Sequence, residues 1–195
     1  MGKILIFIYE GMADFEITFV ANLLGVDLGK EIITIGYEDE LIKSKSGIEY
    51  KPSKLIKDVL EYDIEGLIIP GGNNVEVRAE IINLIQNLNA KGKVLGAICA
   101  GPRFLAKAGV LDNAKYTTSL VKWTEDIAKH FNESDPFPRH NFILDRVVRD
   151  GNIITSQGYA FIDFAIEICD WFGYFEDEND KNSFTKVIKG IWFPI

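Results

Sequence analysis

The sequence predicts an α/β fold with a mostly parallel sheet that helices cover on both faces. Short apolar runs such as "KILIFIY" (3–9), "EIITIGY" (31–37) and "GLIIP" (66–70) are typical of strands buried on both faces. Segments with apolar residues at helical spacing, such as 75–90, alternate with these runs along the chain. Alternating strands and helices form parallel sheets with right-handed crossovers.

The apolar pattern places the elements one after another and leaves residues 120–141 without a clear assignment. Two hairpins are expected at turns that contain glycine, Ser46-Gly47 and Asp150-Gly151. The expected elements are strands 3–9, 31–37, 66–70 and 93–99, helices 14–28, 75–90, 100–111 and 161–175, and hairpins 41–52 and 142–158.

The chain is interpreted as one domain, residues 1–175, followed by a C-terminal apolar extension, residues 176–195. The acidic stretch "EDEND" separates this apolar tail from the last expected helix. Because Ile191, Trp192 and Phe193 would otherwise be exposed together, we expect the extension to pack on the domain or on a dimer partner.

Charge and composition exclude several classes of partner. The 195 residues carry a formal net charge of -8, which argues against binding to nucleic acid and to anionic membrane surfaces. There is no apolar run long enough to span a membrane and no signal peptide pattern. With only two cysteines, Cys99 and Cys169, the chain fits a reducing compartment, so we expect a cytoplasmic protein.

The stretch "VLGAICAGP" (94–102) carries the strongest chemical signal. An apolar strand runs into Cys99 at a bend bounded by Gly96 and Gly101, as in the nucleophile elbow written G-x-S-x-G. At such an elbow we expect a strained backbone at Cys99 with positive φ. The unpaired N–H groups of the following helix should lower the pKa of the thiol. By position alone, Cys99 is either this reactive thiol or a small buried core residue.

Other candidate residues lie at the carboxyl ends of expected strands, where open α/β sheets bind ligands. These are the stretch 10–16 after the first strand, Gly71-Gly72 after "LIIP", and Cys99 itself. Cys169 lies on an apolar helix and is expected to be core packing. The histidines and cysteines lie far apart at no ligand spacing, so neither a metal site nor a cofactor is expected.

The motifs "AICAGPRFLAKAGVL", "LIIPGG" and "YEGMADFE" together resemble the ThiJ/PfpI superfamily. The likeness spans roughly residues 3 to 174 and is strongest to the branch that contains the parkinsonism-associated deglycase. The resemblance implies a flavodoxin-like three-layer sandwich, a homodimer, and an elbow cysteine that is easily oxidised to the sulfinate. It would make residues 1–175 a ThiJ/PfpI-like domain.

The resemblance also implies roles for particular residues. Cys99 would be the nucleophile, and Glu16, in its protonated form, would donate a hydrogen bond to the sulfur. A carboxyl in an apolar pocket should have a raised pKa, which agrees with this role. The alternative, that Glu16 is a solvated residue on the surface of a helix, fits the sequence equally well. The backbone N–H groups of Gly72 and Ala100 would bind an oxyanion, and Gly71 and Gly158 would line the pocket.

The sequence departs from the family pattern at two positions. Where the deglycase branch has a histidine after "YTT", this chain has Ser119, and a hydroxyl is a poor general base at neutral pH. The protease-like branch has a histidine directly after the cysteine, where this chain has Ala100, so peptidase activity is not expected. His140 precedes an expected strand and is either a pocket residue or a surface loop histidine.

Two functions fit these residues. In the first, Cys99 attacks a small electrophilic carbonyl, such as methylglyoxal or its adduct on a protein or nucleotide, and Glu16 transfers protons. This would be a stress-response enzyme of the glyoxalase or deglycase kind. In the second, the protein is a redox-sensing or chaperone-like module in which an oxidant converts Cys99 to the sulfinate, without catalysis.

Overall fold

The structure is a computed structural model that describes residues 2–73 and 76–191. Within these residues, seven strands form one sheet in the order β5-β2-β1-β6-β7-β9-β8, and β3 pairs with β4 in a separate hairpin. The strands are β1 (Lys3–Phe7), β2 (Glu31–Gly36), β3 (Ile42–Lys43), β4 (Glu49–Tyr50), β5 (Lys54–Leu55), β6 (Ile64–Ile69), β7 (Val94–Ile98), β8 (Val147–Asp150) and β9 (Ile153–Ser156).

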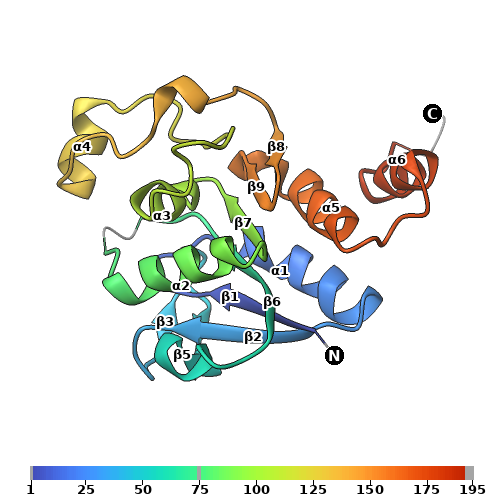
Figure 1. The fold of residues 1–195 in the computed structure, drawn as a ribbon, viewed down its shortest axis with the longest axis horizontal. Helices are drawn as coiled ribbons and strands as arrows, with labels where there is room; N and C mark the ends of the chain where they lie inside the picture. Colours follow the sequence, from blue (N-terminus) through green and yellow to red (C-terminus); the bar gives the residue numbers. More distant parts are fainter. Residues whose placement is uncertain (1, 74–75, 192–195) are drawn as a thin grey trace.

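Helices cover both faces of this sheet, as the sequence predicts. Helices α2 and α3 contact each other on one face, and α1 and α5 contact each other on the opposite face (Figure 1). The helices are α1 (Phe15–Asn22), α2 (Ala79–Ala90), α3 (Pro102–Lys107), α4 (Glu125–Phe131), α5 (Phe161–Trp171) and α6 (Glu178–Ile188), with a π-helical turn (Leu23–Asp27) and 3-10 turns (Ile56–Val59, Arg139–Asn141, Gly158–Ala160).

The strand order makes the sandwich flavodoxin-like. The strands β2, β1, β6, β7 and β9 are parallel neighbours in the order 2-1-3-4-5 of that fold, and β8 pairs antiparallel to β9 at the edge. The order in which successive strands are added to the sheet reverses between the parallel neighbours β1 and β6, so the loops that follow these two strands flank the expected ligand crevice.

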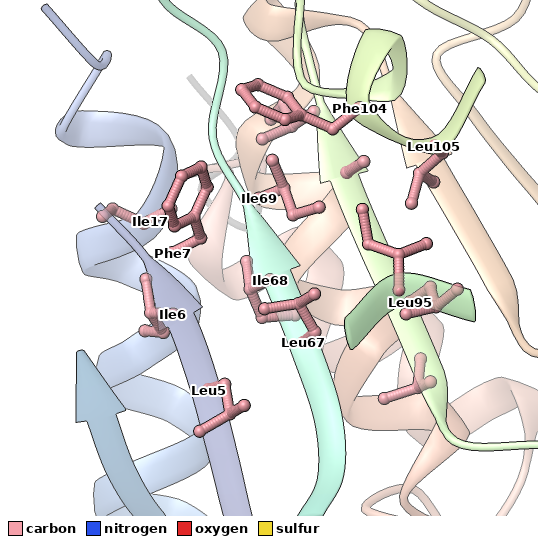
Figure 2. Close-up of a cluster of buried hydrophobic side chains, with 14 of the residues drawn as sticks. Leu5, Ile6, Phe7, Ile17, Leu67, Ile68, Ile69, Leu95, Phe104 and Leu105 are labelled. Carbon is pink, nitrogen blue, oxygen red and sulfur yellow. The ribbon is translucent and has the colours of Figure 1, made fainter. Parts of the chain in front are cut away.

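Apolar side chains fill the space between the layers. Figure 2 shows those of β1 and β6 together with Phe104 and Leu105 of α3. The rings of Phe7 and Phe104 lie edge to face with centroids 5.5 Å apart, which joins β1 to α3. Cys169 is fully buried in the same core, as predicted.

Both predicted hairpins are present. The β3–β4 turn contains Gly47 at φ 91°, and the β8–β9 turn contains Gly151 at φ 55°, a backbone region that favours glycine. The helix expected over 75–90 begins instead at Ala79, and residue 75 lies outside the described residues. Strand β5 was not predicted, because two residues are too short to show an apolar period.

Helix α4 lies in the segment 120–141, which the apolar pattern leaves unassigned. Its ends are set by local chemistry, since the hydroxyl of Thr124 accepts the N–H of Ile127 at 3.3 Å and Asn132 ends the helix at φ 50°. Just beyond it, Glu133 forms ion pairs with Arg103 and Lys107. These pairs attach α4 and the residues after it to α3.

The last three residues of the acidic stretch 176–180 form the start of helix α6. The carboxylate of Asp177 caps this helix by accepting the N–H of Asp180 at 2.9 Å. Lys181 and Lys189 of α6 then form ion pairs with acidic residues of α5, so α6 lies against α5 of the same chain (Figure 1). Ile191 is 66% exposed, and Trp192 and Phe193 lie outside the described residues.

One of these α5 carboxylates serves two cations. Asp163 pairs with Lys189 of α6 and also accepts the guanidinium of Arg146 at 2.6 Å. That guanidinium lies 5.1 Å from the ring centroid of Tyr159. Within residues 2–73 and 76–191, no helix has the length and apolar character needed to cross a membrane.

The turn from β7 into α3 is packed tightly against the end of β6. A Cβ atom at Gly101 would lie 2.5 Å from the carbonyl oxygen of Ile69 and 2.8 Å from that of Ile98. Backbone atoms cannot move aside as a flexible side chain can, so glycine is required there for steric reasons.

We therefore expect Gly101→Ala to lower the free energy of unfolding by about 1–3 kcal/mol or more, because the added methyl overpacks the turn. Urea denaturation measures this loss. Gly25→Ala is the matched control, since its Cβ would lie 3.4 Å from Ile32 in ordinary van der Waals contact. An equal effect of the two substitutions would show that the turn is not tightly packed.

Candidate active site

Cys99 occupies the elbow between β7 and α3 in a strained conformation. Its φ is 62°, which confirms the predicted positive value. Such a conformation costs a non-glycine residue about 1–3 kcal/mol and persists only where the surroundings fix it. Here the Cys99 N–H donates to Ser156 at 2.8 Å, and the Cys99 carbonyl accepts from the hydroxyl of Thr118 at 2.7 Å and the N–H of Ser119 at 2.9 Å.

Glu16 lies in the first turn of α1 and is brought to the sulfur. Its side chain is only 2% exposed, it forms a hydrogen bond with the Cys99 thiol, and Oε2 accepts the N–H of Gly71 at 2.6 Å. A Cβ atom at Gly158 would lie 3.0 Å from both Sγ of Cys99 and Oε1 of Glu16. Glycine at 158 therefore leaves the space in which the sulfur and the carboxyl oxygen meet.

Burial changes the proton affinity of both groups. It raises the pKa of Glu16 to about 7, against the opposing effect of the Gly71 N–H. Burial, followed by the negative charge of Glu16, raises the pKa of the Cys99 thiol to about 11, although the Ser119 hydroxyl and the Ala100 N–H act in the opposite direction. At neutral pH these values keep the thiol protonated and leave Glu16 close to half ionised, and the ionised form of Glu16 can accept the thiol proton.

The expectation that the helix N-terminus lowers the thiol pKa is therefore wrong. Helix α3 begins only at Pro102, and the cost of burying a thiolate beside a carboxylate exceeds what the helix end supplies. The resemblance implied a proton on Glu16 that is donated to sulfur, and the raised pKa of Glu16 keeps this protonated form populated near neutral pH, whereas the thiol is the donor when Glu16 is ionised.

The backbone groups named from the sequence lie around this pair. The Ala100 N–H donates to the sulfur. Gly72 forms a bridge with Met12 whose hydrogen bonds come from the N–H groups of Ala13 and Asn73, so the bridge does not use the Gly72 N–H. Both Gly72 and Ala100 line the cavity, whereas Gly71, expected to line it, is not among the lining residues and donates its N–H to Glu16.

Ser119 and Gly158 complete the inner wall of the cavity. The Ser119 hydroxyl accepts the N–H of Gly158 at 2.9 Å and donates to the Cys99 sulfur. A hydroxyl fixed in this way can stabilise negative charge on sulfur, but it does not serve as a base at neutral pH.

The cavity has a volume of about 600 Å³ and opens above the carboxyl edge of the sheet. It is bounded by the residues that follow β1, β6, β7 and β9, by the β3–β4 turn, and by α4. Cys99 and Glu16 lie at its inner end, and Phe15 and Tyr159, 52% and 65% exposed, lie among its lining residues.

His140 is not a pocket residue, which corrects one of the two readings of the sequence. It lies in an exposed 3-10 turn outside the cavity, because the neighbouring Asn141 bonds this turn to the carbonyl groups of Leu111 and Asp112. The histidine that lines the cavity is His130 of α4, whose Nε2 lies 2.9 Å from the carbonyl oxygen of Asn73.

Sequence reasoning missed the charged residues of the outer wall, Lys45 and Asp126. Lys45 is placed by the β3–β4 turn, where Asp14 accepts hydrogen bonds from Ser46 at 2.6 Å and Tyr50 at 3.1 Å. Asp126 and His130 are placed by α4. The cap at Thr124 followed by two acidic residues is the signal that would have identified this helix.

In the described part of the chain, no three or more histidine, cysteine, aspartate or glutamate side chains are grouped so as to hold a metal ion.

A flavodoxin-like sandwich with a strained cysteine at a strand-to-helix elbow, in contact with a buried carboxyl, defines a class of cysteine-elbow α/β proteins. The chain belongs to the DJ-1/PfpI family, whose family model matches residues 2–170.

Individual relatives agree with this assignment. A glutathione-independent glyoxalase of Caenorhabditis elegans is 28% identical over 166 residues, covering 82% of this chain and 82% of that protein. The deglycase PfpI of Pyrococcus furiosus is 27% identical over 158 residues, covering 80% and 89%. The crystal structure of a DJ-1 superfamily protein from Agrobacterium tumefaciens has the same fold, with a TM-score of 0.79 at 23% identity over 97% of this chain and 98% of that one.

The raised pKa of Glu16 makes stability depend on pH in a defined direction. The neutral carboxyl is favoured in the folded state, so its stabilising contribution is complete below the unfolded pKa of 4.5 and is lost as pH rises through about 7. Glu16→Gln should therefore gain about 3 kcal/mol relative to the wild type between pH 4.5 and 8.

Urea denaturation of both proteins at the two pH values measures this difference. Glu61→Gln is the matched control for the loss of one carboxyl group, because Glu61 is exposed and does not line the cavity. A Glu16→Gln difference that does not change with pH would mean that Glu16 ionises normally in the folded protein.

Proposed function

We propose that this protein is a cysteine-dependent enzyme that acts on small reactive carbonyls, 2-oxoaldehydes such as methylglyoxal or their adducts. The observation that carries the proposal is the hydrogen bond between Cys99 and the buried Glu16 at the inner end of a cavity. The presence of a glyoxalase and a deglycase among the relatives supports the same chemistry.

The first step follows from the proton positions. The carboxylate of Glu16 takes the thiol proton as Sγ of Cys99 adds to the aldehyde carbon. A carbon–sulfur bond forms, and the electron pair of the carbonyl bond moves onto its oxygen. The N–H groups of Gly72 and Ala100 are proposed to face this oxygen, and Glu16 then returns the proton to it.

A carboxyl with a pKa of about 7 suits both halves of this step, because it accepts and donates protons readily near neutral pH. For a 2-oxoaldehyde, moving the hemithioacetal hydrogen to the neighbouring carbon gives a thioester. Water then cleaves the carbon–sulfur bond, so that oxoaldehyde and water yield a 2-hydroxy acid and the free thiol.

The non-catalytic redox module is the second candidate, because the Ser119 hydroxyl and the Ala100 N–H already donate to the sulfur and would hold sulfinate oxygens. The thiolate is the form that peroxide attacks, and the raised thiol pKa keeps its population small at neutral pH. Carbonyl addition with Glu16 as base does not need a standing thiolate population, and it is favoured for that reason.

Turnover of methylglyoxal to lactate tests the proposal. Cys99→Ser should abolish it, and Glu16→Gln should lower kcat by about 10²–10⁴-fold, because general base catalysis is lost. In the wild type, kcat/KM should rise with pH through about 7 as Glu16 becomes the carboxylate. Cys169→Ala, a core substitution remote from the cavity, should retain turnover.

Intact mass after peroxide treatment separates the two candidates. A wild type that converts Cys99 to the sulfinate but turns over no carbonyl would contradict the enzyme and support the redox module. Turnover that persists in Cys99→Ser would contradict both.

The proposal includes a homodimer that resides in the cytoplasm. Val187 and Ile191, which are 55% and 66% exposed on and after α6, form part of an apolar edge that an assembly would cover. Light scattering at micromolar protein should give the mass of a dimer, and the mass of a single chain would contradict it.

A further inference from the structure

The cavity is much larger than a small carbonyl requires. Its volume of about 600 Å³ lies in the range of sites for drug-sized ligands, about 300–1,000 Å³. Beside the reacting atoms there is little room next to Gly158, since even a Cβ atom there would approach Sγ of Cys99 and Oε1 of Glu16 to 3.0 Å. A substrate that fits both parts has a small reacting head and a larger group beyond it.

The wall beyond the reacting atoms is mostly apolar. Besides Glu16 and His130, the cavity lining carries two charged side chains, Lys45 and Asp126. Their opposite signs offset each other, so this pair favours neither an anion nor a cation. The apolar lining side chains are Ala13, Phe15, Leu120, Ile127, Phe131 and Tyr159.

Two of these side chains are exposed aromatic rings that neighbouring residues hold in place. Phe15 packs edge to face against Phe161, with centroids 5.6 Å apart. The ring of Tyr159 lies beside the guanidinium of Arg146, which Asp163 anchors at 2.6 Å. Rings fixed before the ligand arrives lose little entropy on binding, so they form a preorganised aromatic surface.

We propose that the preferred substrate is an uncharged 2-oxoaldehyde that carries an aromatic group, an inference that rests on the proposed function. The aldehyde lies at Cys99 and Glu16, and the aromatic group lies against Phe15 and Tyr159. The chemistry at sulfur is that described above, so an aryl oxoaldehyde and water give an aryl 2-hydroxy acid.

Phenylglyoxal and methylglyoxal are the probes, with initial formation of mandelate and lactate as the measured rates. The KM for phenylglyoxal should be lower by about tenfold or more, because an aromatic ring buries much more apolar surface than a methyl group. Cys99→Ser supplies the blank, since phenylglyoxal also reacts with surface arginines.

Phe15→Ala and Tyr159→Ala should each reduce the preference for phenylglyoxal by about fivefold, as expected when an aromatic contact is lost. Leu144→Ala is the matched control, because Leu144 is 71% exposed and does not line the cavity. It should leave both rates and their ratio unchanged. Circular dichroism confirms that each variant is folded.

The outcomes distinguish this inference from the proposed function. Turnover of both oxoaldehydes with equal KM overturns the aromatic preference and leaves the enzyme in place. Turnover of neither overturns both. If Phe15→Ala and Tyr159→Ala dissociate a dimer in light scattering but leave the preference unchanged, the two rings belong to an interface between copies of the chain, and the inference is wrong.

Discussion

The left-handed backbone at Cys99 is the constraint on which the rest of the site depends. It turns the chain out of β7 before α3 begins and directs the sulfur toward Glu16 instead of into the core. Three hydrogen bonds offset its cost: the Cys99 N–H donates to the Ser156 carbonyl of β9, and the Cys99 carbonyl accepts from Thr118 and Ser119. The strain is thus stored in a residue that the sheet and a neighbouring loop fix from two sides.

The fold could be predicted from sequence because its strands are buried on both faces and its helices have one apolar face. These patterns depend on local spacing, and they gave the layers and both hairpins correctly. Elements whose stability comes from other sources were missed. Strand β5 is too short to show a period, α4 is defined by its caps, and α6 is held to α5 by ion pairs between distant residues.

The inner part of the site was predictable for a related reason. Cys99, Glu16 and the glycines follow strand ends, and parallel strands bring those ends together. The thiol pKa was predicted in the wrong direction, because the sequence shows a helix start but not the depth of burial or the adjacent charge. The choice of His130 over His140 depends on how the segment 120–141 folds over the cavity, which local spacing does not encode.

Asp163 has a consequence for the whole molecule, because one carboxylate serves both the C-terminal helix and the rim of the cavity. Its partners Lys189 and Arg146 are partly exposed, so added salt screens both pairs at once. Added salt is therefore expected to weaken both the contact of α6 with α5 and the contact that orders the Tyr159 ring. Under the proposed function, the C-terminal helix and the aromatic wall of the cavity would thus loosen together as ionic strength rises.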